Sequence, residues 1–196
     1  MATPMSAEAF LKALRDAGLD VVEHAGWQTH NRAGHGPWGP VHGVVIHHTA
    51  TTGTDTSVRL CWDGSTDLPG PLCHGVIDKS GTMHLVGCGR ANHAGRGDGD
   101  VLRAVIAERQ LPPVTKADTD GNVYFYGFEC VNLGDGKDPW PEAQLAAIEK
   151  AAAAVCRYHG WSERSVIGHL EWEPGKVDPK GFGMGWLRER IHDRLK

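Results

Sequence analysis

The chain has 196 residues, of which 40% are hydrophobic and 22% are charged, and its formal net charge is −4. This composition argues against intrinsic disorder, and the slightly acidic balance predicts no affinity for nucleic acid or for an anionic membrane surface. No apolar run approaches the roughly 18 residues that span a membrane, and residues 1–20 lack the pattern of a secretory signal. We therefore expect one domain, made in the cytoplasm without a signal peptide and without membrane insertion.

The elements expected in the first half of the chain follow from apolar spacing and from turn residues. They are an amphipathic helix at 6–18 capped by Ser6, a turn-rich loop at 21–43, a buried strand at 43–48, a short helix at 56–62, and a hairpin whose strands, 74–78 and 82–86, flank Lys79-Ser80-Gly81. The hairpin prediction rests on the glycine in its turn.

The second half is read in the same way. It predicts a helix at 101–110 capped by Asp100, a polar loop at 112–121, a second buried strand at 123–131, a helix at 141–158, a short strand at 165–168 and a closing helix at 186–195. Interspersed helices and strands with one hairpin favour an α/β fold, a single domain in which a central mixed sheet is flanked by helices. We divide it into an N-terminal helix and wrapping segment (1–42), a core (43–182) and a C-terminal helix (183–196).

Five cysteines are dispersed along the chain without a Cys-x-x-Cys pair. An odd, scattered set in a cytosolic chain predicts buried thiols rather than a disulfide framework. Their redox state stays open at this point.

Polar groups that could bind zinc cluster between residues 166 and 179, where His169, Lys176 and Asp178 lie within about ten residues of one another. A catalytic zinc uses three protein ligands plus water, so His169 and Asp178 leave one ligand missing. His47 is the best candidate, because it ends a predicted strand and strand ends point into the crevice where α/β folds place their sites. For His47 alone, a solvated imidazole at a strand end is the competing interpretation. Only one of His47 and His48 can face a metal, since successive strand residues face opposite sides.

These residues resemble a known family. The stretches Val45-Ile46-His47-His48-Thr49-Ala50, His74 before the hairpin, Ala91-Asn92-His93-Ala94-Gly95 and the segment from His169 to Pro179 are similar, in this order, to zinc-dependent N-acetylmuramoyl-L-alanine amidases. This family includes peptidoglycan recognition proteins, and the last motif looks most like that of endolysins from phages of actinobacteria. The resemblance covers roughly residues 43–182, the amidase core.

The resemblance implies a role for each residue. His47, His169 and Asp178 would bind one Zn²⁺, which lowers the pKa of bound water to about 7. Glu129 would act as general base and then acid, and Lys176 would stabilise charge on the carbonyl oxygen. From the residues alone, a solvent-facing carboxylate at Glu129 and a solvated ammonium at Lys176 remain alternatives.

The resemblance also implies that His74 and His93 line the substrate cleft, the alternative being structural histidines that satisfy loop carbonyls. Two positions depart from the family pattern. Cys73 stands where many relatives carry a tyrosine, whose hydroxyl helps catalysis in some of them, and this leaves more of that role to Glu129. Asn92 stands where many carry tryptophan, which puts in doubt how the peptide is gripped. A cysteine nucleophile at Cys73 would leave the three zinc-type ligands unexplained.

The implied function is hydrolysis of the amide bond between N-acetylmuramic acid and L-Ala in bacterial peptidoglycan. A monomeric endolysin, made in the cytoplasm and acting on the wall after release, fits the last motif and the lack of a signal. Three alternatives remain open: a cytosolic amidase that recycles soluble muropeptides, a non-catalytic wall-recognition module, and a regulatory protein that binds an intracellular partner. The wall-recognition module is disfavoured because such relatives typically lack a zinc ligand.

Overall fold

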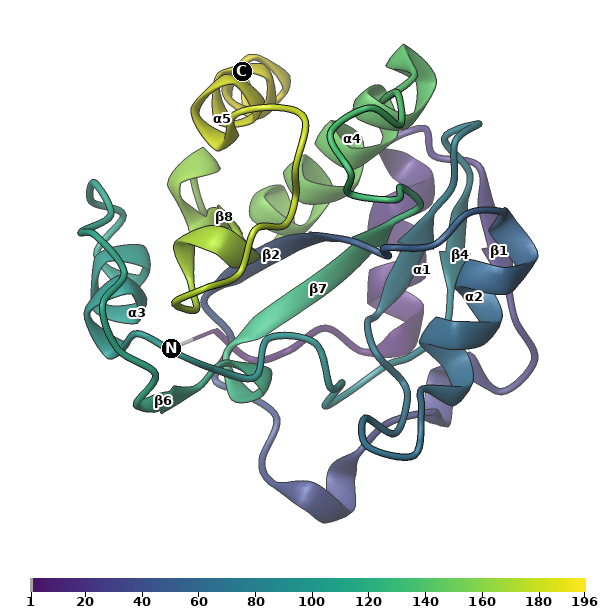
Figure 1. Cartoon of the computed structure of the whole chain (residues 1–196), viewed down its shortest axis with the longest axis horizontal. Coiled ribbons are helices and arrows are strands. Elements are labelled where there is room, and N and C mark those ends of the chain that lie inside the picture. The colour runs from purple at the N-terminus through teal and green to yellow at the C-terminus, as the bar shows by residue number, and fades with distance from the viewer. Residues whose placement is uncertain (1) are drawn as a thin grey trace.

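A mixed sheet of six strands, in the order β1-β4-β3-β7-β2-β8, runs through the computed structural model, which describes residues 2–196 (Figure 1). The β3–β4 pair is antiparallel and the other neighbouring strands are parallel. Helices cover both faces, so the expected single α/β domain with a central mixed sheet is confirmed.

The strands are short, and two of them form a separate ribbon, β5–β6. Their bounds are β1 Val21–Glu23, β2 Gly43–His48, β3 Gly75–Ile77, β4 Met83–Leu85, β5 Arg96–Gly97, β6 Thr119–Asp120, β7 Phe125–Cys130 and β8 Val166–Gly168.

Five α-helices and five 3₁₀ turns connect these strands within the described residues. Their bounds are α1 Ala7–Asp16, η1 Trp27–Thr29, η2 Ala33–His35, α2 Thr54–Asp63, α3 Gly99–Ile106, η3 Gly121–Val123, α4 Glu142–His159, η4 Glu163–Ser165, η5 His169–Glu171 and α5 Met184–Leu195. No helix in residues 2–196 is both long enough and apolar enough to cross a membrane.

Strand β2 is buried on both sides, which explains why its sequence is a continuous β-branched run rather than an alternating one. Val44 and Ile46 belong to the core that includes α1, α4 and α5, whereas Val45 belongs to a second core with α3. Side chains alternate along a strand. His47 therefore lies on the same side as Val45, away from α4.

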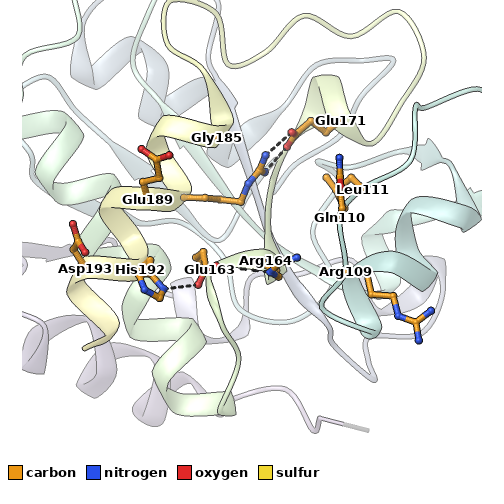
Figure 2. Close-up of a pocket in the computed structure, with 11 residues that line it drawn as sticks. Arg109, Gln110, Leu111, Glu163, Arg164, Glu171, Gly185, Glu189, His192 and Asp193 are labelled. Carbon is orange, nitrogen blue, oxygen red and sulfur yellow. Dashed lines mark hydrogen bonds and ion pairs between the residues drawn. The ribbon is translucent and has the colours of Figure 1, made fainter.

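Strand β8 is an edge of the sheet, and two of its backbone groups bind side chains instead of another strand. Gly168 N donates to Glu171 Oε2 at 3.0 Å, and Val166 O accepts from Arg188 Nη1 at 3.1 Å. Arg188 also binds the Glu171 carboxylate through both terminal nitrogens, each at 2.8 Å. Figure 2 shows this ion pair as the dashed lines that end on Glu171, at the wall of a cavity of about 850 Å³. The pair covers the edge strand β8, which directly precedes His169.

Most expected elements are confirmed within a few residues, but four details of the prediction were wrong. Val21–Glu23, expected in a loop, forms β1. Its hydrogen bonds come from pairing with β4, and a run of three residues is too short to predict a strand from its own pattern. Thr119–Asp120 forms β6 inside the expected polar loop. Asp98, rather than Asp100, caps α3 through the Asp100 N–H. Helix α4 begins at Glu142, with Pro141 as its N-cap residue.

Candidate metal centre

Three potential metal ligands converge at the carboxyl end of β2. His47 Nδ1 lies 3.1 Å from His169 Nδ1 and 3.0 Å from Asp178 Oδ2, and the latter two atoms are 3.1 Å apart. The three atoms thus form a nearly equilateral triangle. Within the described part of the chain, this is the group of His, Cys, Asp or Glu side chains whose ligand atoms are close enough to share an ion.

The triangle fits zinc. Zinc–ligand bonds of about 2.0–2.1 Å in a tetrahedron separate the ligand atoms by about 3.3 Å, close to the separations seen here. His47 and His169 are 1% and 5% exposed, so two nitrogen ligands lie in a protected site. A set of two imidazoles and one carboxylate leaves the fourth position open, which is the arrangement of a catalytic rather than a structural zinc.

Different parts of the fold carry the three candidate ligands. His47 is the fifth residue of β2, opposite Glu129 of β7 in the parallel register. His169 directly follows β8. Asp178 is brought back to it by a loop that closes when Leu170 N donates to Asp178 O at 2.8 Å. Residues far apart in sequence therefore meet because β2 pairs with both β7 and β8.

The far nitrogen of each imidazole also has a partner. His47 Nε2 lies 3.0 Å from His93 Nδ1, and His169 Nε2 lies 3.2 Å from Glu173 Oε2. The contact to Glu173 was not expected from the sequence. Its only signal was the spacing of four residues from His169, which brings two side chains to the same side of a helical turn.

Glu129 lies beside this centre, opposite His47, and one of its carboxylate oxygens has no partner within the described residues. Its Oε2 atom is buried, and no hydrogen-bonding group within residues 2–196 reaches it. Burial, reinforced by the Asp178 charge and opposed by the Lys176 charge, raises the pKa of Glu129 to about 8. A carboxyl group that exchanges its proton near neutral pH is suited to general acid–base chemistry.

Electrostatics favour the unprotonated forms of two ligands. Burial lowers the pKa of His47 to about 4, so its imidazole is neutral at pH 7. Burial opposes ionisation of Asp178, but the adjacent His169 and His47 imidazoles outweigh it and hold the pKa of that carboxyl well below its usual range. Neutral imidazole and carboxylate are the forms that bind a metal ion.

His74 differs from the expected cleft-lining position. Its side chain is 1% exposed, its Nε2 lies 2.9 Å from Gly89 O, and its Nδ1 accepts from Gly127 N at 2.9 Å. Trp38 stacks on its ring, with centroids 5.0 Å apart. Both nitrogens are therefore used by the backbone, and the imidazole is a structural one that joins two loops to β7.

His93 also differs from that expectation. It is 8% exposed, and besides His47 it contacts Phe125 O through Nε2 at 2.9 Å. No ring nitrogen is left for a substrate. Its surroundings therefore support a role in contacting the His47 imidazole rather than in lining the cleft.

His48 and Cys73 are not among the grouped ligand atoms. His48 Nδ1 accepts from Lys180 N at 3.1 Å, so of the two adjacent histidines only His47 faces the centre, as expected. Burial raises the pKa of the Cys73 thiol well above its usual range, which makes it a poor nucleophile. All five cysteines are free thiols; four are buried and Cys88 is partly exposed.

Solved structures of amidases share the fold. N-acetylmuramoyl-L-alanine amidase LysC from Clostridium intestinale is 13% identical with a TM-score of 0.59, the match covering 88% of this chain and 97% of that one. A mutant endolysin from Bacillus subtilis is 17% identical with a TM-score of 0.58, covering 88% and 99%. The E. coli amidase AmiD, in complex with the substrate anhydro-N-acetylmuramic acid-L-Ala-D-γ-Glu-L-Lys, is 19% identical with a TM-score of 0.58, covering 86% and 65%.

No curated protein matches the chain by sequence. A family model does: that of N-acetylmuramoyl-L-alanine amidase, Amidase_2, matches residues 37–181. This segment contains His47, His93, Glu129, His169 and Asp178, and so includes the complete triangle with its neighbours. The chain belongs to the N-acetylmuramoyl-L-alanine amidase family.

Proposed function

We propose that this enzyme is zinc-dependent and hydrolyses the amide bond between N-acetylmuramic acid and L-Ala of the peptidoglycan stem peptide. The observation that carries the proposal is the triangle of His47 Nδ1, His169 Nδ1 and Asp178 Oδ2, with separations of 3.0–3.1 Å. A zinc ion held by these atoms would supply a Lewis acid that polarises the scissile carbonyl and activates water.

Glu129 handles the proton. As a carboxylate it accepts a proton from the attacking water, and as a carboxylic acid it donates that proton to the leaving amine. Two features support this role: the buried Oε2 has no competing partner in the described chain, and Glu129 lies opposite His47 in the β2–β7 register.

Lys176 stabilises negative charge as it develops on the carbonyl oxygen. Its positive charge already acts on Glu129 and on His47, which puts the ammonium group in the electrostatic environment of the centre. A positioned positive charge of this kind lowers the barrier without taking part in bond making.

We further propose that residues 1–196 act as one catalytic unit. The family match begins at residue 37, yet the segment before it is part of the fold. Phe10 and Trp27 are 2% and 1% exposed in the main core, and Met5 N donates to the Tyr126 hydroxyl at 2.8 Å. We also propose that the enzyme acts as a monomer.

The biological context we propose is that of a phage endolysin, which reaches the bacterial wall after release from the cytoplasm. Similarity to endolysin structures supports this. The alternative is a recycling enzyme for soluble muropeptides, a role favoured by similarity to AmiD, whose solved complex holds a soluble anhydro-N-acetylmuramic acid peptide.

Mass spectrometry of products tests both parts. Purified wall and a soluble anhydro-muropeptide are each incubated with the zinc-loaded protein, with and without a chelator. We expect intact stem peptides with a free L-Ala amine, formed faster from wall and only without chelator. Cleavage elsewhere, or cleavage that persists in metal-free protein, contradicts the proposed reaction; preference for the soluble substrate contradicts the endolysin context.

A further inference from the structure

The direction of the hydrogen bond between His47 and His93 is set by a third group. His93 Nε2 lies 2.9 Å from Phe125 O, a backbone carbonyl that can only accept. In a neutral His93 the proton is therefore on Nε2, and Nδ1 is an acceptor. His47 Nε2, 3.0 Å from that Nδ1, must then donate. The proton of a neutral His47 is on Nε2, and the lone pair of its Nδ1 points into the triangle.

The second imidazole is held in the same way by a different partner. His169 Nε2 lies 3.2 Å from Glu173 Oε2, and an ionised carboxylate can only accept. His169 Nδ1 faces a second carboxylate oxygen, Asp178 Oδ2, at 3.1 Å, so Glu173 and Asp178 compete for the single imidazole proton. A zinc ion in the triangle would bind Nδ1 and Asp178, which leaves the proton on Nε2 toward Glu173. The Nδ1 lone pair of His169 then faces the same point as that of His47.

Two glycines provide the space for these partners. A Cβ atom at Gly127 would lie 2.4 Å from His93 Nδ1, so a side chain there would displace the imidazole. A Cβ atom at Gly95 would lie 3.1 Å from Glu173 Oε2. Residues 93–95 thus take part in both contacts: His93 is the partner of His47, and Gly95 lies beside Glu173, the partner of His169.

We propose that His93 and Glu173 are positioning residues, which hold both ligand imidazoles with the proton on Nε2 and so present two Nδ1 lone pairs to zinc. This inference rests on the proposed function. Groups outside the coordination sphere that fix the tautomer of a ligand histidine raise metal affinity, and their loss typically costs about 10–100-fold. Each residue acts on the metal site through the imidazole that it contacts.

The first test is zinc affinity, measured by competition with a chromophoric chelator. His93→Phe keeps the ring but removes the acceptor, and Glu173→Ala removes the carboxylate; each should weaken zinc binding about 10–100-fold. His93→Gln and Glu173→Gln keep an oxygen acceptor and should recover most of the affinity. Glu189→Ala, an exposed acid on α5, and His159→Phe, on the α4 side of the sheet, serve as matched controls and should bind zinc like the wild type.

The second test reads the tautomers directly in metal-free protein, by ¹⁵N NMR of the imidazole rings at a pH where they are neutral. We expect His47 and His169 to carry the proton on Nε2 in the wild type, and His169 to lose this preference in Glu173→Ala. Because Glu173 is partly exposed, this variant should fold even if His93→Phe does not.

The outcomes separate this inference from the proposed function. Wild-type protein that binds no zinc contradicts the proposed function, while the tautomers still test the positioning. If the wild type binds zinc but Glu173→Ala and His93→Phe bind it equally well, or if either imidazole carries its proton on Nδ1, the positioning role is wrong.

Discussion

Two glutamates with buried carboxylate oxygens show how differently this fold treats the same side chain. Glu149 of α4 is 2% exposed, and each of its oxygens is bound by an arginine of α5, Oε1 by Arg190 and Oε2 by Arg194 at 2.6 Å. Glu129 of β7 has a buried Oε2 with no partner in the described residues, and burial raises its pKa to about 8.

These two environments indicate which of the two carboxyl groups can exchange a proton during a reaction. A buried carboxylate that is fully paired holds two elements together and gains nothing from exchanging a proton. A buried carboxyl group without a partner costs stability, and such a cost is typical of a functional site. Each glutamate can be tested against this division.

The largest effect should come from the centre itself. His169→Ala removes one corner of the triangle, and because three protein ligands are the minimum for a catalytic zinc, we expect it to abolish both zinc content and wall lysis. Metal analysis and turbidity of a wall suspension measure the two. Lysis by the metal-free variant would contradict a metal-dependent reaction.

The next effect concerns Glu129 alone. Glu129→Ala should retain zinc, because Glu129 is not a corner of the triangle, but lose about 10²–10⁴-fold in turnover with the general base. Turnover per bound zinc, with Glu149→Ala as the control for a buried glutamate elsewhere, checks this. Near-normal turnover would remove Glu129 from the reaction.

A substitution at Glu149 tests whether its role is structural. Glu149→Ala removes the shared partner of two arginines, of which Arg190 keeps its contact with Glu142. Because both arginines are about a third exposed, we expect a loss of about 2 kcal/mol in the free energy of unfolding. Chemical denaturation of metal-free protein measures it. Turnover per bound zinc should not change; a loss of turnover in a folded protein would mean that the two glutamates are coupled.

A smaller, pH-dependent effect should appear in metal-free Glu129→Gln. The folded protein keeps the Glu129 proton up to about pH 8, whereas the unfolded chain releases it above about pH 4.3. Raising the pH between these values therefore destabilises the wild type. The variant lacks this loss, so its stability relative to the wild type should grow by at least about 2 kcal/mol from pH 5 to pH 8. A constant difference across denaturation curves would contradict a raised pKa.

Much of the fold could be predicted from local patterns. The β-branched run of β2, the alanine-rich body of α4 and the glycine in the β3–β4 turn each impose their structure through nearby residues, and these elements were located correctly. Strand β1 was missed because three residues carry too little periodicity, and its hydrogen bonds come from β4.

The candidate site, like the fold, could be predicted only in part. The residue types and order of His47, His169 and Asp178 were readable in the sequence, because zinc chemistry restricts ligands to a few side chains. The roles of His74 and His93 were not. Which atom an imidazole bonds to depends on what the fold places around it, and a spacing along the chain carries no such information.

The class of fold, the three candidate ligands and an acid on the neighbouring strand could be read from the order of amino acids. Three further features became apparent only once the chain was folded. Two Nδ1 atoms and one carboxylate oxygen meet within 3.0–3.1 Å, Glu129 lies beside them with a buried oxygen that has no partner within residues 2–196, and His93 and Glu173 contact the far nitrogens of the two imidazoles. Identity and periodicity are properties of the chain, whereas distance, burial and hydrogen-bond direction arise when β2 pairs with β7 and β8.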